Sequence, residues 1–428
     1  LPLLTRLESV PLAYAIGNRL HEISPVPRER FRFLDAWEKK SVYEAIKEAV
    51  DNHFDIGLVG DWGVENYGAN ITYYALYAFL HEQMGYDVLL IERPANAVWK
   101  PKNPPTLFQK VPYPEYAMAR YAQDKGKLFA FNEKCDAFIV GSDQIWNNDL
   151  YHAFGEWADL NWVDNSHRKI AYATSFGRDE VLESNRDRVV RKHFFERFDA
   201  ISVREDTAVP LMKKQYGVES TQVLDPVFLC EKEKYDELTK DSCPLLLSEP
   251  AFIFSYTLDM NEEKRELLHQ AAQLSGNEVI IAGDAAKSSS DEGAEVGNWK
   301  ANLSLEEWLA HIQTCQFMIT DSFHGMCFAI INHKPFIAIV NQHRGATRFY
   351  SLLKQLGLED RAFNSIHEAG KNLRKLFFEP IDWENVDEKL AEARKHSLEW
   401  LKHALHAPRT KSEQLSDYDI LAPNAARH

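Results

Sequence analysis

Short apolar runs that alternate with helical stretches are the feature that most limits what this chain of 428 residues can fold into. The first run is "DIGLVG" at 55–60, a helical stretch follows from about 69 to 83, and "YDVLLIE" occupies 86–92. Short runs bounded by turn residues and separated by helical sequence are typical of βαβ units around a parallel sheet. We therefore predict that the first half of the chain forms a doubly wound lobe.

The alternation continues to about residue 230 and starts again at about 251, after the polar, charge-rich stretch 231–249. We read that stretch as a linker. The prediction is an α/β fold of two Rossmann-like lobes, 53–230 and 250–378, with a cleft between them.

Three further segments do not fit either lobe. Residues 1–52 are charged with helical spacing, so we expect a helical extension, which we also read as a link to a further upstream segment. The stretch 99–114 holds five prolines and is expected to be a loop. Residues 379–428 are expected to form a C-terminal helix and a tail.

Composition limits the partners. The formal net charge of −15 argues against a nucleic-acid surface, whereas local arginines still suffice for a small anion because distant charges are screened within ~8 Å. No run reaches the ~18 apolar residues of a membrane span, and no secretory signal is recognisable. The five cysteines are scattered without C-x-x-C spacing, which favours a reducing cytoplasm and neither a disulfide framework nor a zinc site.

The segment "VGSDQIWNND" at 140–149 follows a predicted strand with a cluster of polar residues. In an open parallel sheet, ligands bind beyond the carboxyl ends of the strands. Asp143 is read as a base or an orienting group for a hydroxyl, and Trp146 either stacks on a sugar or belongs to the core. The candidate binding residues here are Ser142, Gln144, Trp146 and Asn147.

The turn at 60–76 leads from the first strand into a helix, where backbone N–H groups can receive an anion. Its glycines lack the G-x-G-x-x-G spacing of a dinucleotide site, and a plain β-to-α turn explains them equally well. Asn66, Tyr67 and Gly68 are kept as binding candidates.

Arg204 follows the apolar run "ISV", where its guanidinium either captures a carboxylate or phosphate or pairs with Glu205 or Asp206. Asp225 precedes Pro226, so it is read as a turn or capping residue rather than a catalyst.

His324 stands in "TDSFHG", at the junction of an apolar strand and a helix. Thr320, Asp321 and Ser322 are N-cap candidates, and Ser322 is also kept as a binding candidate. Capping gives no reason for the histidine. A histidine in the first helical turn, next to a bound phosphate, is suited to donate a proton near neutral pH. Downstream, Arg344 and Arg348 either form an anion clamp or leave Arg348 facing solvent. These residues together indicate a two-lobed cytoplasmic enzyme that handles an anionic donor without a metal or a dinucleotide.

Taken in order, seven stretches resemble the polysaccharide pyruvyl transferase family. They are "NYGA" with "YYAL" (66–69 and 73–76), "FIVGSDQIWN" (138–147), "AYATSFG" (171–177), "SVRED" (202–206), "VLDPVFL" (223–229), "TDSFHGMCFAIINHKPF" (320–336) and "TRFYSLLKQLGL" (347–358). The resemblance leaves residues 1–52 and the C-terminal tail unexplained.

The resemblance implies a fold like that of the GT-B glycosyltransferases. It implies transfer of a pyruvyl group from phosphoenolpyruvate to a sugar of a cell-surface polysaccharide or its lipid-linked precursor, giving a ketal. The family's functional histidine would be His324, its anion-binding arginine Arg204, and its acid Asp143. No cofactor or integral membrane segment is implied; homo-oligomerisation and peripheral attachment at the inner face of the plasma membrane stay open.

Two alternatives remain. A nucleotide-sugar glycosyltransferase would need a ribose- or base-binding acid in the second lobe, for which Glu306 or Glu307 is the candidate. A non-catalytic scaffold lobe of a glycan-assembly protein would need no intact charged cleft.

Overall fold

The computed structural model describes residues 53–60, 66–92, 130–147, 155–181, 183–241, 246, 250–283, 297–301, 303–340 and 345–409. The predicted N-terminal helical extension, the proline-rich stretch and the end of the C-terminal tail lie outside these residues.

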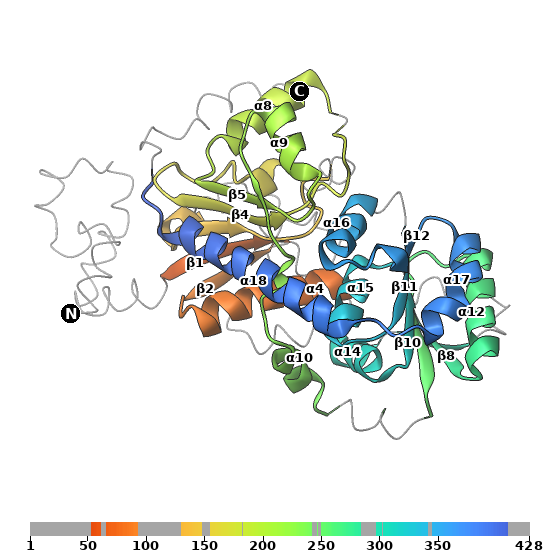
Figure 1. Cartoon of the computed structure of the whole chain (residues 1–428). Coiled ribbons are helices and arrows are strands. Elements are labelled where there is room, and N and C mark those ends of the chain that lie inside the picture. Colours follow the sequence, from red (N-terminus) through yellow and green to blue (C-terminus); the bar gives the residue numbers. More distant parts are fainter. Residues whose placement is uncertain are drawn as a thin grey trace, which may run out of the picture.

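The first lobe is built on a parallel sheet with strand order β2-β1-β3-β4-β5-β6 (Figure 1). Its strands are β1 (Phe54–Gly60), β2 (Val88–Glu92), β3 (Cys135–Val140), β4 (Arg168–Thr174), β5 (Ala200–Val203) and β6 (Thr221–Gln222). Its helices are α4 (Tyr67–Ala78), α8 (Asn185–Phe195) and α9 (Ala208–Tyr216), and α4 continues as the π-helical turn η3 (Phe79–Gln83). Three short 3-10 turns are η5 (Ala130–Glu133), η6 (Gly155–Asp159) and η7 (Pro226–Phe228).

The second lobe repeats this plan with strand order β12-β11-β10-β7-β8-β9, again parallel. The strands are β7 (Phe252–Tyr256), β8 (Glu278–Gly283), β9 (Asn298–Ala301), β10 (Phe317–Thr320), β11 (Phe336–Ile339) and β12 (Ala362–Phe363). The helices are α12 (Glu262–Ser275), α14 (Leu305–Thr314), α15 (Phe323–Ile331), α16 (Ala346–Leu356), α17 (Ile366–Phe378) and the turn η9 (Glu359–Arg361). Two parallel α/β lobes confirm the predicted fold.

The strands of both sheets are buried because helices cover both faces. All residues of β7, β10 and β11 are buried, as expected of parallel strands that read as continuous apolar runs. One apolar cluster belongs to the first lobe, one to the second, and a third contains residues of both. The shared cluster includes Leu76 of α4, Trp308 of α14 and Phe328 of α15, so the lobes pack directly on each other.

The stretch read as a linker contains more structure than the sequence suggested. Helix α10 (Lys232–Thr239) packs on α14, where Gln313 hydrogen-bonds to both Asp236 and Thr239. Tyr235 is buried against Phe328 at 4.9 Å between ring centroids. The polar residues that suggested a linker form the outer face of this helix.

The last helix joins the lobes a second time. Helix α18 (Trp383–His406) starts beside the second lobe and runs back along the first (Figure 1). Ser397 accepts a hydrogen bond from the backbone N–H of Leu224 at 2.9 Å, and Arg168 donates to the carbonyl of Ala404 at 2.8 Å. The C-terminal helix therefore fastens the second lobe to the strands of the first.

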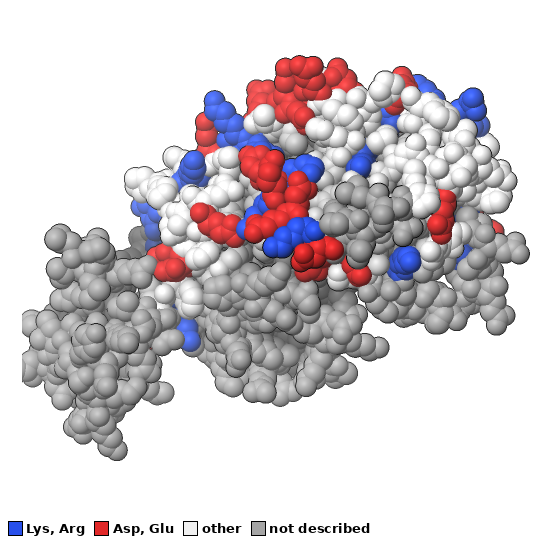
Figure 2. All heavy atoms as spheres, turned by 90° about the horizontal axis from the view of Figure 1, so that it is seen from below, with Lys and Arg blue, Asp and Glu red and all other residues white. Residues whose placement is uncertain are grey.

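The surface carries charges of both signs. Lys234 of α10 pairs with Glu82, and Lys232 pairs with Asp236. Figure 2 shows acidic and basic side chains interspersed over the described part of one face. No helix in the described part of the chain is both long and apolar enough to cross a membrane.

Candidate active site

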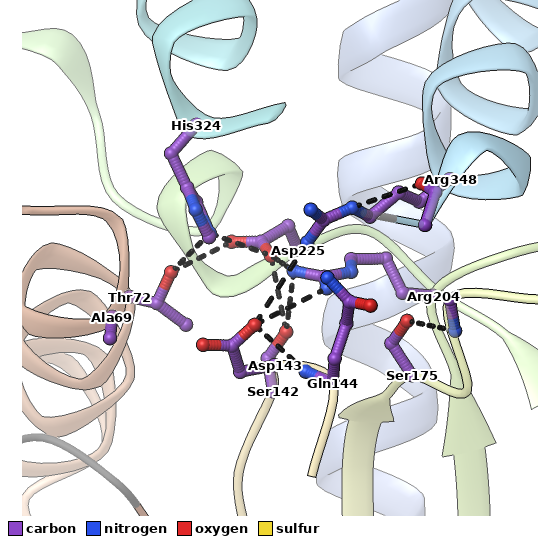
Figure 3. A network of polar contacts seen from close by, with 12 residues as sticks. Ala69, Thr72, Ser142, Asp143, Gln144, Ser175, Arg204, Asp225, His324 and Arg348 are labelled. Atoms are coloured by element: carbon purple, nitrogen blue, oxygen red, sulfur yellow. Dashed lines mark hydrogen bonds and ion pairs between the residues drawn. The ribbon is translucent and has the colours of Figure 1, made fainter. Parts of the chain in front are cut away.

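The candidate site lies where the carboxyl edges of the two sheets face each other. In each sheet the strand order changes direction at one point: successive strands are first added on one side of the initial strand and then on the other. This point lies between β1 and β3 in the first lobe and between β7 and β10 in the second. Such switch points are where ligands bind in doubly wound folds. Asp143 follows β3 and His324 follows β10, and Figure 3 shows them in one polar network with Arg204, Asp225 and Arg348.

Asp225 is the centre of this network. Its Oδ2 accepts hydrogen bonds from Arg204 Nη1 at 2.5 Å and from Ser142 Oγ at 3.1 Å, and lies 3.5 Å from His324 Nε2. Its Oδ1 accepts from the N–H of Val227 at 3.1 Å. Burial opposes the charge of this carboxyl, but the contact with His324 and the positive charge of Arg204 outweigh it and hold the pKa of Asp225 below its usual range.

The sequence reading of Asp225 was incomplete. The residue does cap η7, with Pro226 at the first position of the turn, as its place before a proline indicated. The same carboxylate also pairs with Arg204, which sequence reasoning did not assign. Two signals were available: its position after β6 at the carboxyl edge of the sheet, and its place in "VLDPVFL", one of the seven stretches that resemble the family.

His324 reaches across the boundary between the lobes. It stands in the first turn of α15, which Ser322 caps by accepting from the N–H of Gly325. Its side chain is 7% exposed, and Nε2 lies 2.8 Å from Thr72 Oγ1 of α4. The ring also rests on Gly68, where a Cβ atom would come within 2.1 Å of Nδ1. Helix α4 therefore holds the histidine of the other lobe.

Two arginines, one from each lobe, converge on the ring of Phe323. The guanidinium of Arg204 lies 4.7 Å and that of Arg348 5.1 Å from the ring centroid. Burial and the neighbouring charge of Arg204 lower the pKa of Arg348 to about 10, which leaves it charged at neutral pH. Among the described residues, Nε and Nη2 of Arg204 have no hydrogen-bond partner although they are buried. Unsatisfied buried donors of this kind are typical of an anion site.

Asp143 faces both arginines without a hydrogen bond to either. Its Oδ1 lies 3.8 Å from Arg204 Nη2 and 3.9 Å from Arg348 Nη1, and its side chain is 25% exposed. The backbone has φ = 133°, a conformation rare for a residue with a side chain, which costs about 1–3 kcal/mol. Ser175 N–H donates to the carbonyl of Asp143 at 2.9 Å and helps to hold this geometry. Asp143 is thus the most accessible charged group of the network.

The pairing of Arg204 with its sequence neighbours does not occur. Glu205 is buried and accepts from Ser175 Oγ, Phe176 N and Gly177 N at 2.8–3.1 Å, so it fixes the loop after β4. Asp206 donates its backbone N–H to Ser351. Arg204 is neutralised instead by Asp225, a residue 21 positions away.

Of the two interpretations of Trp146, the structure agrees with the core residue and not with a side chain that stacks on a sugar. Its side chain is 0% exposed and packs against Phe176, Phe195 and Phe198, while Nε1 donates to the carbonyl of Ala158. The chain turns sharply after β3, and this turn directs Trp146 into the core while it leaves Asp143 at the sheet edge.

The other predicted binding residues divide into two groups. Ser142 joins the network through Asp225, and Gln144 lies between Gly177 and Gly345 where the lobes meet, accepting from Asn147 Nδ2 at 2.9 Å. Asn66 caps α4, and Tyr67 donates to the carbonyl of Leu303 in the second lobe. In this structure these two have structural roles, and Gly68 makes room for His324. Arg344 lies outside the described residues.

No metal site is found in the part of the chain that the structure describes. Nowhere in that part do three or more histidine, cysteine, aspartate or glutamate side chains form a group that could hold a metal ion. Glu307, a candidate acid for a nucleotide sugar, forms a capping box with Ser304 at the start of α14.

Comparison with known proteins adds to this geometry. Two solved structures with the same fold are UDP-N-acetylglucosamine 2-epimerase from Rickettsia bellii (14% identity, TM-score 0.54, covering 84% of this chain and 99% of that one) and MnaA of S. aureus with UDP (13%, 0.50, 84% and 98%). They support the GT-B-like arrangement of the two lobes and nothing finer. No curated protein matches the chain significantly.

The match to a protein family is more specific. Residues 66–343 match the family described as polysaccharide pyruvyl transferase, a range that begins at the cap of α4 and includes Asp143, Arg204, Asp225 and His324. This range covers more than half of the sequence and most of each lobe. The chain therefore belongs to the polysaccharide pyruvyl transferase family.

Proposed function

We propose that this protein transfers a pyruvyl group from phosphoenolpyruvate to a sugar of a cell-surface polysaccharide or its lipid-linked precursor, forming a ketal, in the cytoplasm. The observation that carries the proposal is the convergence of two buried guanidiniums, Arg204 and Arg348, on the half-buried Asp143, next to a buried histidine. Family membership supplies the reaction class, and these residues supply groups with the required charges.

The donor is a small dianion or trianion, with a phosphate and a carboxylate close together. Arg204 is held on its Nη1 side by Asp225, which leaves Nε and Nη2 as donors for an incoming oxyanion. Arg348 approaches from the other lobe and would bind the second anionic group. A donor bound this way bridges both lobes, because each lobe contributes one guanidinium.

The proposed reaction begins with protonation of the methylene carbon of the enolpyruvyl group. His324 serves as the general acid, and the central carbon takes on oxocarbenium character. One acceptor hydroxyl attacks that carbon and gives its proton to Asp143. The C–O bond to phosphate then breaks as Asp143 passes its proton to the departing phosphate. The second hydroxyl closes the ketal, and its proton restores the acid form of His324. The balance is one phosphoenolpyruvate and one diol converted to one ketal and one inorganic phosphate.

The glycosyltransferase alternative finds less support. Of its two candidate acids, Glu307 is used in capping α14, where its carboxylate accepts from the N–H of Ser304 at 2.7 Å.

Phosphate release from phosphoenolpyruvate in the presence of candidate sugars tests the proposal. The wild-type protein should release phosphate only when a suitable acceptor is present. His324→Ala should lower the rate by about 10²–10⁴-fold, the usual contribution of a general acid–base group. The matched control is His333→Ala, because the side chain of His333 is 47% exposed and pairs on the surface with Asp387. Turnover of a nucleotide sugar instead, or full activity in His324→Ala, would contradict the proposal.

A further inference from the structure

Thr72 of α4 is the closest polar contact of the His324 ring. Its hydroxyl oxygen lies 2.8 Å from Nε2, and the hydroxyl is fully buried. The two residues are 252 positions apart in sequence and belong to different lobes. Nothing in the local sequence of either residue predicts the contact, and Thr72 is not among the residues that the sequence pointed to.

The direction of this hydrogen bond follows from the second partner of Thr72. Oγ1 also lies 3.4 Å from Asp225 Oδ1, and it donates its hydrogen to that oxygen. Asp225 can only accept, because its carboxyl is ionised and its pKa is held low by His324 and Arg204. A hydroxyl has one hydrogen to give, so an oxygen that donates to Asp225 must accept from the imidazole.

We infer that Thr72 is a positioning residue that fixes His324 with a hydrogen on Nε2, and that Nδ1 is therefore the nitrogen that gains and loses the catalytic proton. The relay runs from Nε2–H to Thr72 Oγ1, and from the Thr72 hydroxyl to the Asp225 carboxylate. One ring nitrogen that is tied to a fixed acceptor determines the tautomer and the orientation of the other. The role of Nδ1 in catalysis rests on the proposed function, whereas the tautomer of His324 does not.

Gly68 allows the ring to come close enough to α4 for this contact. It lies one helical turn before Thr72, so both residues are on the face of α4 that meets the imidazole. A Cβ at position 68 would lie 2.1 Å from Nδ1 and 2.7 Å from Cγ, far inside contact distance. Glycine within a helix costs roughly 0.5–1 kcal/mol relative to alanine. The missing side chain of Gly68 is thus what lets the imidazole of His324 pack against α4.

The experiment measures the tautomer directly. In protein labelled with ¹⁵N-histidine, the ¹⁵N chemical shifts of the His324 ring, assigned by their loss in His324→Ala, report which nitrogen carries hydrogen. For the neutral ring of the wild type we expect Nε2 protonated and Nδ1 unprotonated. Thr72→Val, which keeps the shape and removes the hydroxyl, should give a mixture of tautomers, whereas Thr72→Ser should keep the wild-type pattern.

Kinetics of phosphate release provide the second readout. Thr72→Val should lower kcat by about 10–100-fold with little change in the KM for phosphoenolpyruvate, and Thr72→Ser should recover most of the rate. Gly68→Ala should lose rate although Thr72 is intact. A neutral wild-type ring protonated on Nδ1, or a Thr72→Val variant with normal kcat, would overturn the inference. Failure of the proposed function is distinguishable, because the tautomer is measured without turnover.

Discussion

Replacing Asp225 with asparagine should destabilise the protein far more than a change of one atom suggests. Both carboxylate oxygens act only as acceptors: Oδ2 for Arg204 and Ser142, and Oδ1 for Val227 N–H and the Thr72 hydroxyl. Asparagine has a single acceptor oxygen, so in either orientation its NH₂ group faces donors. The guanidinium of Arg204, whose side chain is 2% exposed, loses its closest counter-charge.

The expected loss is about 3–5 kcal/mol, the usual cost of breaking a buried ion pair by removing one partner. Chemical denaturation at pH 7, followed by tryptophan fluorescence, measures the free energy of unfolding of Asp225→Asn. The matched control is Asp387→Asn, which removes the carboxylate of an exposed pair with His333 and should cost at most about 1 kcal/mol.

The pH dependence gives the sign of the effect. Because the native pKa of Asp225 lies below its unfolded value of ~3.9, its ionised form stabilises the native state fully above that value. The difference between wild type and Asp225→Asn should stay constant from pH 7 to about pH 5 and shrink as the pH falls below 4. If Asp225→Asn costs no more than Asp387→Asn at pH 7, the central role of this carboxylate is refuted.

Three further changes test separate parts of the site. Arg204→Lys should lower kcat/KM for phosphoenolpyruvate at least ~30-fold, because an ammonium cannot hold Asp225 and a second anion together. This loss corresponds to about 2 kcal/mol, at 1.36 kcal/mol per tenfold. The control is Arg394→Lys, which changes a more exposed pair with Glu231 and should leave the kinetics unchanged. Gly345→Ala should cost more free energy of unfolding than Gly85→Ala, since both have positive φ but only Gly345 has Gln144 and Gly177 within 3.1 Å of the added carbon; equal losses would contradict close packing of the lobes there. Trp146→Phe should lower stability by about 1–3 kcal/mol without raising the KM for the acceptor sugar, and a raised KM at unchanged stability would restore it as a binding residue.

The sequence predicted the lobes because their signal is local and repeated. Parallel strands buried on both faces read as short apolar runs, and each run from "DIGLVG" to "PFIAIV" contains a strand of the structure. The strands β9 and β12 gave no such signal, because their sequences, NWKA and AF, do not lie in a continuous apolar run. The helix α10 was also missed, because its charged outer face resembles a connecting segment.

The sequence by itself also determined which side chains stand at the ends of strands, and this placed His324, Arg204 and Asp143 at the edges where the lobes face each other. Only the tertiary structure decided their partners. Thr72, Asp225 and His324 come from segments up to 252 residues apart, and each has an adequate local explanation as a helix residue, a cap or a first-turn residue. Hydrogen bonding and charge pairing depend on distances of a few ångströms, which packing of α4 against α15 sets and which no local pattern of residues contains.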